Sequence, residues 1–206
     1  MNDLIKRILS SIILLPLVLY FILTGSFYLI FLIIFCFLVS SYEWHKMVKK
    51  INYRLSGFVF LIISFYTFYE IAINYDVLFP LLICISTDIG GYIFGKIFKG
   101  PKLTKISPNK TYAGMIGGYF LSILSVILYL EYMSYEIKIF WLIITIVISS
   151  VSQIGDIFIS YFKRLSKIKN TGNIIPGHGG LLDRIDGMIF VFPIYYLIEL
   201  TGYITL

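Results

Sequence analysis

Long apolar runs separated by short polar segments cover almost the whole chain. A helix that crosses a bilayer needs roughly 20 predominantly apolar residues. Runs of about that length lie near residues 8–24, 26–42, 56–73, 77–95, 112–130, 139–157 and 187–205. Only helices and closed barrels satisfy their backbone in lipid, and the alternating pattern of barrel strands is missing from the sequence. The pattern predicts an all-α polytopic membrane protein with about seven transmembrane helices.

The composition supports this interpretation. Hydrophobic residues make up 59% of the chain, compared with ~45–50% in soluble domains. So little lies between the runs that we expect one transmembrane domain over residues 1–206. The first run follows Lys6 and Arg7, as in a signal peptide, but no small-residue cleavage site follows, so we interpret it as a retained span. Cys36 and Cys84 both lie inside apolar runs, which argues against a disulfide or a thiolate metal site.

Lysine and arginine residues fall almost entirely on one side of the predicted spans. Sixteen of the 17 lie on the side of the N-terminus, and Lys138 alone lies on the other. Cytoplasmic loops carry such an excess, so we predict a cytoplasmic N-terminus and an external C-terminus. Setting topology and contacting anionic lipid heads are sufficient roles for Lys46, Lys49, Lys50 and Arg54.

A polar block near the end of the chain is unusual for such a protein. Residues 160–186 hold five cations, two carboxylates, one histidine and a glycine-rich turn between two apolar runs. Ionisable groups beside the bilayer are costly and mark function. We therefore place the functional site at the cytoplasmic face, built mainly from residues 86–118 and 152–187.

Two segments upstream of this block carry further candidates. Asp88 lies toward the cytoplasmic end of an apolar run and is followed by three glycines that would permit close backbone approach. The alternative for Asp88 is a helix-end carboxylate paired with Lys96. The stretch Ser107-Pro108-Asn109-Lys110-Thr111 has the form of a helix start, where free N–H groups suit a phosphate. An ordinary proline-containing cap with surface lysines is the alternative there.

The sixth predicted helix carries a polar stripe. Asp156, Ser160, Lys163 and Lys167 fall within ~60° of one face at ~100° per residue. Such a stripe would hold a metal at its carboxylate and bind phosphates through its cations, and the planar fork of Arg164 beside it suits bidentate contacts. The alternative is a ladder of ion pairs along the helix.

The glycine-rich turn runs from Pro176 to Gly180 and is followed by Asp183 and Asp186, which share a helix face. Carboxylates suit Mg²⁺, which binds one or two of them together with substrate phosphates. His178 reads either as a hydrogen-bonding turn residue or as a phosphate contact or acid.

Together these residues resemble the phosphatidate cytidylyltransferase, or CDP-diacylglycerol synthase, family. The C-terminal pattern of that family is Ser-x-x-Lys-Arg, four residues, Lys-Asp, then Pro-Gly-His-Gly-Gly, two residues and Asp-Arg-x-Asp. It stands here as Ser160, Lys163, Arg164, Lys169, Asn170, Pro176 to Gly180, Asp183, Arg184 and Asp186. Residues 107–118, the surroundings of Asp88, the N-terminal run and Tyr42-Glu43-Trp44 are similar to further stretches of the family.

Three positions depart from the family pattern. Asn170, Asn109 and Ala113 stand where the family has Asp, Lys and Glu. Asn170 retains an acceptor oxygen but loses a charge, and Ala113 lacks the carboxylate altogether. The chain is also short for the family. The set formed by Asp156, Lys163 and Asp183 is unchanged.

The resemblance implies transfer of CMP from CTP to phosphatidic acid, which gives CDP-diacylglycerol and pyrophosphate. We expect Mg²⁺ at Asp156 and Asp183, with a second cation left open, and Lys163, Arg164 and Asp186 as catalytic residues. No nucleic-acid partner is expected, and a homodimer is left open. The residues expected to bind CTP or the lipid phosphate are Asp88, Ser107, Lys110, Thr111, Ser160, Lys169, His178, Gly179 and Arg184.

Two other functions are compatible with the sequence. A transporter of an anionic solute is also many-spanning with charges at broken helices, but no second half of this chain mirrors the first. A non-catalytic relative that acts as a membrane scaffold is compatible with the three substitutions. The spacing of CDP-alcohol phosphotransferases is absent from the sequence.

The charge distribution makes a prediction about orientation. A reporter fused to the C-terminus should behave as non-cytoplasmic, and one inserted near Asn170 should behave as cytoplasmic, because the cation excess holds the second on the inner side. Accessibility of each reporter in intact cells measures this. The opposite result would exclude both the topology and the placement of the site.

Overall fold

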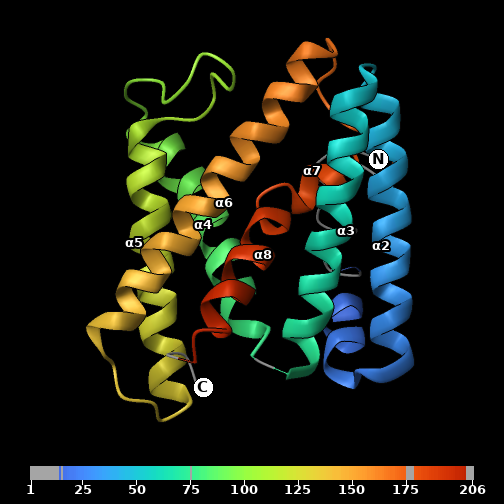
Figure 1. Cartoon of the computed structure of the whole chain (residues 1–206). Coiled ribbons are helices and arrows are strands. Elements are labelled where there is room, and N and C mark those ends of the chain that lie inside the picture. The colour runs from blue at the N-terminus through green and yellow to red at the C-terminus, as the bar shows by residue number, and fades with distance from the viewer. Residues whose placement is uncertain (1–13, 15, 75, 175–178, 203–206) are drawn as a thin grey trace. The chain divides into compact units, whose positions relative to one another are not determined.

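The computed structural model describes residues 14, 16–74, 76–174 and 179–202. Over these residues the elements follow in the order α2 (Ser26–Met47), α3 (Ile51–Asn74), α4 (Leu78–Phe98), α5 (Tyr112–Tyr132), α6 (Ile139–Leu165), α7 (Leu182–Ile185) and α8 (Met188–Glu199) (Figure 1). Residues 16–24 are also helical. The described part contains no strand, and an isolated bridge joins Lys102 to Thr111. The all-α prediction is confirmed.

Five helices, α2 to α6, are long and apolar enough to cross a bilayer. Each corresponds to one predicted run, so the prediction of a polytopic membrane protein is confirmed. The expected first run over 8–24 lies partly outside the described residues.

The expected span over residues 187–205 is wrong in its extent. Helix α8 has 12 residues and ends at Glu199, and the chain turns over Leu200 to Gly202, where Gly202 has φ +69°. A helix this short does not reach the roughly 20 residues that a perpendicular crossing requires. The count of seven spans is therefore not confirmed.

The connection between α2 and α3 also differs from the prediction. A polar loop over residues 43–55 was expected, but α2 continues to Met47 and α3 begins at Ile51. The side chain of Arg54 explains the tight turn, because its guanidinium donates to the carbonyls of Val48 and Lys49, both at 3.0 Å. These bonds satisfy carbonyls at the end of α2 that helix geometry leaves without intrahelical partners.

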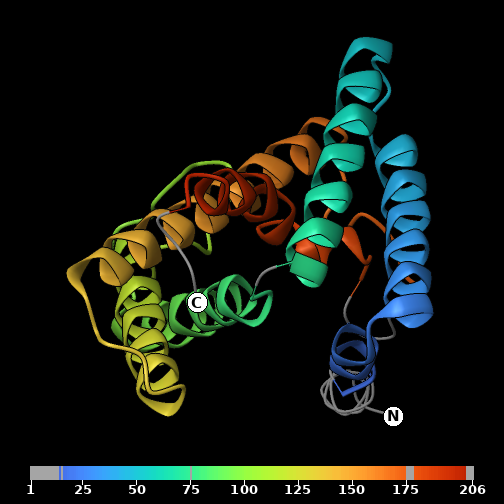
Figure 2. The ribbon, with the colours of Figure 1, turned by 60° about the horizontal axis from the view of Figure 1, so that its bottom comes forward.

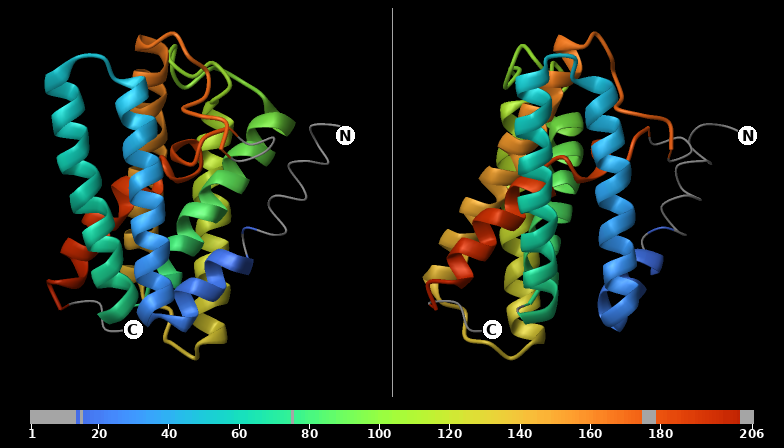
Figure 3. Two further views of the ribbon diagram at one scale, coloured as in Figure 1. Left: turned by 90° about the vertical axis from the view of Figure 1, so that its right-hand side faces the viewer. Right: turned by 45° about the vertical axis from the view of Figure 1, so that its right-hand side comes forward.

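The chain divides into two compact units, the first formed by Met1–Asn74 and Phe162–Asp186. In this unit α2 and α3 run antiparallel and side by side (Figure 3). The last turn of α6 packs on their connected ends, with the ring of Phe162 5.0 Å from that of Trp44 and 5.8 Å from that of Tyr53. The Ser166 hydroxyl donates to the Met47 carbonyl at 2.6 Å. The chain then returns to α7, which contacts α2 (Figure 1).

The second unit comprises Tyr75–Tyr161 and Gly187–Leu206. Its helices α4 and α5 lie along each other (Figure 2) and meet through glycines. A Cβ atom on Gly90 would lie 2.3 Å from the Gly117 carbonyl oxygen, and one on Gly114 would lie 2.7 Å from the Gly91 carbonyl oxygen. Helix α6 joins this pair where the Thr87 hydroxyl donates to Ser149 at 2.9 Å. Small residues at helix contacts are typical of membrane proteins.

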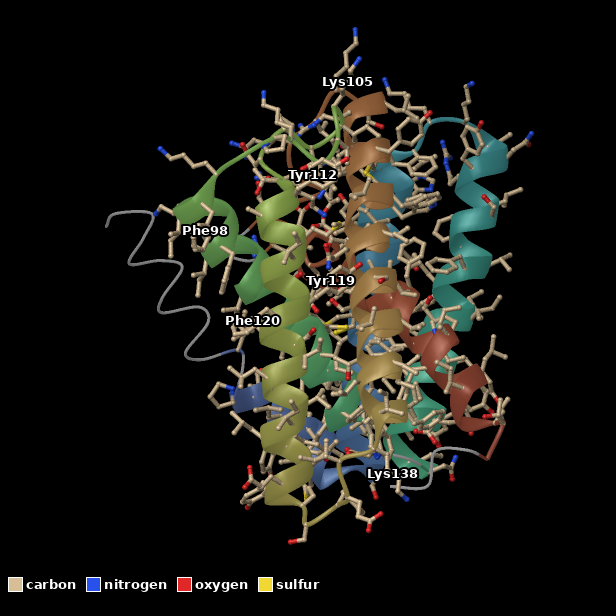
Figure 4. The ribbon with its side chains drawn as sticks, turned by 90° about the vertical axis from the view of Figure 1, so that its left-hand side faces the viewer. Phe98, Lys105, Tyr112, Tyr119, Phe120 and Lys138 are labelled. Carbon is tan, nitrogen blue, oxygen red and sulfur yellow. The ribbon has the colours of Figure 1, made fainter. Side chains whose placement is uncertain are left out.

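The two ends of the second unit differ in their number of lysines, since residues 96–110 hold five and the connection between α5 and α6 holds one. Figure 4 shows Lys105 in the loop that precedes α5 and Lys138 at the opposite end of the same helix. The exposed side chains of Phe98 and Phe120 project from α4 and α5. Exposed apolar side chains of this kind suit contact with lipid along the length of a spanning helix. Which of these ends faces the cytoplasm stays a prediction.

The glycine contact between α4 and α5 predicts a specific sensitivity. Gly90→Ala should lower the free energy of unfolding by ~1–3 kcal/mol, because its Cβ would overlap the backbone of α5. Gly91→Ala is the matched control, since its Cβ would lie 3.7 Å from the Gly114 carbonyl oxygen and alanine favours helix. Thermal unfolding in detergent compares the two variants. Equal melting temperatures would contradict the packing described.

Candidate functional site

The centre of the site in the first unit is the ammonium group of Lys163. Lys163 is only 8% exposed, and its Nζ lies 3.0 Å from Asp183 Oδ1 and 3.5 Å from Asp186 Oδ2. A buried charge is tolerated only when it is paired and hydrogen-bonded. Helix α6 supplies the lysine, and the chain supplies both carboxylates 20 or more residues later. We call Lys163, Asp183 and Asp186 the Lys163 cluster.

Asp183 also organises the loop that precedes it. Its Oδ2 accepts the backbone N–H of Thr171 at 2.8 Å and that of Gly180 at 3.0 Å. One side chain therefore binds both ends of the segment between residues 171 and 180. Gly179 has φ +93°, which favours glycine, and a Cβ there would lie 3.0 Å from the same Asp183 oxygen.

Asp186 follows α7 directly and lies between α7 and α8. One predicted position within this region is wrong in detail. Lys167 was expected on the helical stripe, but α6 ends at Leu165 and Lys167 has φ +56°. The Lys167 N–H donates to the Arg164 carbonyl in a closing turn at 3.0 Å. The stripe therefore ends with Lys163.

Three further predicted cations of the first unit are exposed: Arg164, Lys169 and Arg184. Arg164 donates through Nη1 to the Ile168 carbonyl at 3.2 Å. Asn170, which replaces the family's Asp, lies beside Gly179. His178 lies outside the described residues.

The second unit holds a separate group around Asp156. Its carboxylate forms an ion pair with Lys110 and accepts a hydrogen bond from the Ser160 hydroxyl at 3.3 Å. The side chains of Lys110 and Asp156 are 23% and 31% exposed. We call Lys110, Asp156 and Ser160 the Asp156 group. Asp156 and Ser160 are one turn apart on α6, as the stripe predicted, but the lysine partner comes from another segment. The alternative was a ladder of ion pairs along α6, but Asp156 pairs with Lys110 and Lys163 pairs with Asp183.

Lys110 is placed by the start of α5. Thr111 is the N-cap of this helix, and its hydroxyl oxygen accepts the Gly114 N–H at 3.1 Å, which confirms the predicted helix start. Ser107 lies in the preceding turn, where its carbonyl accepts the Lys110 N–H at 3.0 Å. The Tyr112 N–H donates to the Pro101 carbonyl at 3.2 Å, so part of the expected anion-binding backbone is already in use.

Asp88 lies in the interior of α4, and its side chain is exposed. The next residue along the helix toward the N-terminus is Thr87, which binds α6 through Ser149. Asp88 therefore sits beside the contact at which α4 meets α6, within the unit that contains the Asp156 group.

Both predicted metal ligands offer oxygen atoms but differ in how many are free. Among the described residues, no group of three or more His, Cys, Asp or Glu side chains is placed to hold a metal ion. A carboxylate has about four acceptor positions; Asp156 uses two of them and Asp183 uses three. Mg²⁺ normally completes such a partial set with water and substrate phosphates. The donor chemistry therefore fits Mg²⁺, with Asp156 the more open ligand.

Two residues important to the site were not predicted: Glu43 and Thr171. The Glu43 carboxylate accepts hydrogen bonds from the Thr171 hydroxyl and from the N–H groups of Leu181 and Leu182. A carboxylate in an otherwise apolar helix was a signal in the sequence, since such groups are costly near lipid. Its partners lie more than 120 residues away, and nothing in the sequence indicated that they would contact Glu43.

Comparisons with known proteins agree on one family. The family model described as "Cytidylyltransferase family" matches residues 55–201. The chain is 37% identical over 209 residues to a Rickettsia felis protein named phosphatidate cytidylyltransferase. This alignment covers 94% of this chain and 91% of the relative.

Two other relatives carry the same name. A Rickettsia bellii protein is 37% identical over 96% of this chain and 91% of its own length. A Staphylococcus aureus protein is 37% identical over 79% of this chain and 66% of its own length. The match to the family model over residues 55–201 includes every residue of the Lys163 cluster and of the Asp156 group.

Proposed function

The chain belongs to the cytidylyltransferase family, and we propose that it is a phosphatidate cytidylyltransferase. It transfers CMP from CTP to phosphatidic acid in the bacterial inner membrane and releases pyrophosphate. The single observation that carries this proposal is the Lys163 cluster, a buried ammonium between two carboxylates beside a glycine-rich loop. The site faces the cytoplasm, where CTP is present.

The reaction requires two polyanions to approach each other. A phosphate oxygen of phosphatidic acid attacks the α-phosphorus of CTP, and the bond from that phosphorus to the bridging oxygen of the β-phosphate breaks. The lipid phosphate is already ionised near neutral pH, so no strong general base is needed. Positioning and neutralisation of charge supply most of the catalysis in such transfers.

The cations of the chain meet this demand in two ways. Lys163 is preorganised by its carboxylate partners, and Arg164, Lys169 and Arg184 are exposed and able to gather phosphates. A guanidinium binds a phosphate through two parallel hydrogen bonds. Lys110 forms a partly exposed ion pair, and exposed pairs are weak enough to exchange partners.

Mg²⁺ supplies charge neutralisation to the phosphates when it is bound, and Asp156 and Asp183 are the residues that would hold it. Their oxygens are the ligands this ion prefers. That both carboxylates bind one ion stays a prediction, since they belong to different units. Release of pyrophosphate that depends on both CTP and phosphatidic acid, by purified protein in detergent, tests the activity. Absence of release would favour the transporter or the scaffold.

Lys163 and Lys167 should differ sharply. Lys163→Ala should lower turnover by at least ~10²-fold, as removal of one preorganised donor does. Lys167→Ala, the matched control, should have a much smaller effect, because its side chain is exposed beyond the end of α6. Turnover is measured on protein whose folded fraction has been checked by thermal unfolding. Equal losses of turnover in the two variants would show that the cations contribute only their summed positive charge and not a specific contact.

Asp156→Asn and Asp183→Asn should each abolish turnover without preventing membrane insertion, because the amide binds a hard cation poorly. Asp186→Asn should cost less, since its contact with Lys163 is longer. Asp76→Asn, next to the start of α4, is the control. The measurement is activity against Mg²⁺ concentration for each purified variant. Near-normal activity and Mg²⁺ dependence in Asp156→Asn would refute the metal assignment.

A further inference from the structure

Glu43 is a carboxylate that the proposed chemistry does not use. It lies one turn before the end of α2 and is 1% exposed. A buried carboxylate is costly unless several donors satisfy it. Glu43 has three: its Oε1 accepts the Leu181 N–H at 3.0 Å, and its Oε2 accepts the Leu182 N–H and the Thr171 hydroxyl, both at 2.8 Å.

All three donors come from the two ends of one segment. Thr171 lies where the chain leaves α6, and Leu181 and Leu182 lie where α7 begins. Glycines allow the segment to close on the carboxylate: a Cβ on Gly172 would lie 2.5 Å from Glu43 Oε1, and one on Gly180 would lie 2.5 Å from Oε2. A larger residue at either position would force the Glu43 carboxylate to move. The base of the loop is therefore built around Glu43.

The same base holds Asp183. Thr171 donates its hydroxyl to Glu43 and its N–H to Asp183, while the consecutive N–H groups of Gly180 and Leu181 go to Asp183 and Glu43 respectively. Asp183 in turn contacts Lys163 at 3.0 Å. A short chain of hydrogen bonds thus leads from Glu43 through Thr171 to the Lys163 cluster.

We propose that Glu43 is a positioning residue for the transfer reaction. It holds the side chain of Thr171 and the backbone of residues 181 and 182, and so sets where Asp183 presents its oxygens and where Lys163 is held. The proposal rests on the proposed function, in which the Lys163 cluster binds phosphates. Because Glu43 is 1% exposed, it would act through these hydrogen bonds and not by contact with substrate.

The effect should appear in turnover more than in substrate binding. Glu43→Gln has the same shape but replaces one acceptor oxygen with a donor, so at least one of the N–H groups or the hydroxyl faces an unsuitable partner. We expect kcat to fall by ~10-fold or more while KM for CTP changes little, since small misplacements of catalytic groups have effects of this size. Thr171→Val should lower kcat in the same direction, and Thr171→Ser, which keeps the hydroxyl, should restore it.

The matched control is Glu70→Gln on α3 of the same unit, where the partly exposed carboxylate accepts a hydrogen bond from the Asn74 side-chain amide. Turnover is measured per folded molecule, with the folded fraction taken from thermal unfolding in the same detergent. The kcat of a double variant, Glu43→Gln with Lys163→Ala, shows whether the two effects are additive. A general loss of stability would not change this additivity. If Glu43 acts through the cluster, the double variant should lose little more than Lys163→Ala alone.

The outcomes separate the two proposals. A wild-type kcat in Glu43→Gln would overturn the positioning role alone. So would a double variant whose fold-loss in kcat equals the product of the losses in Glu43→Gln and Lys163→Ala. Wild-type protein that shows no CTP-dependent release of pyrophosphate would overturn the proposed function instead. Loss of kcat in Glu43→Gln and Thr171→Val, recovery in Thr171→Ser and no change in Glu70→Gln would support the positioning role.

Discussion

Burial of the Lys163 ammonium is the constraint on which the first unit depends. A charged amine near the lipid boundary has few water molecules to solvate it, so its cost must be offset by carboxylates at contact distance. Asp183 and Asp186 provide them, at 3.0 and 3.5 Å. Because the lysine belongs to the last turns of α6 and the carboxylates come after the loop, this pairing forces the chain to fold back. The position of α7 follows from that return.

The fold-back would leave backbone N–H groups buried, and two carboxylates divide them. Asp183 accepts those of Thr171 and Gly180, and Glu43 accepts those of Leu181 and Leu182. Each carboxylate also accepts a third group, the Lys163 ammonium at Asp183 and the Thr171 hydroxyl at Glu43. Hydrogen bonds to ionised groups are stronger than neutral ones, and more so in surroundings of low dielectric. The base of the loop is consequently a rigid platform, built from acceptors that are almost fully occupied.

The second unit positions its charges by a different device. Glycines bring α4 and α5 into backbone contact, and Thr111 caps α5 so that Lys110 meets Asp156 on α6. This pair is partly exposed, whereas Lys163 is buried. An exposed ion pair contributes little to stability and can exchange its partner for a phosphate, but separating a buried one is costly. The two lysines are therefore suited to different tasks, Lys110 to exchange and Lys163 to constant presentation of charge.

The sequence by itself determined the class of fold, the family and the residues of the polar block. Hydrophobic runs, an asymmetry of cations and a dense polar pattern are local properties, and lipid imposes them directly on each segment. Helices α2 to α6 lie where the runs predicted, and Thr111 begins a helix as its surroundings indicated.

Only the tertiary structure decided which charges meet. The helical stripe predicted Lys167 beside Lys163, but the helix ends first, because a positive φ at Lys167 turns the chain. Lys163 then pairs with residues 20 and more positions away, and Asp156 pairs with Lys110. The role of Glu43 was hidden for the same reason. A carboxylate accepts hydrogen bonds from whichever N–H groups the fold brings to it, and no pattern along the chain records donors that lie 138 and 139 residues apart from their acceptor.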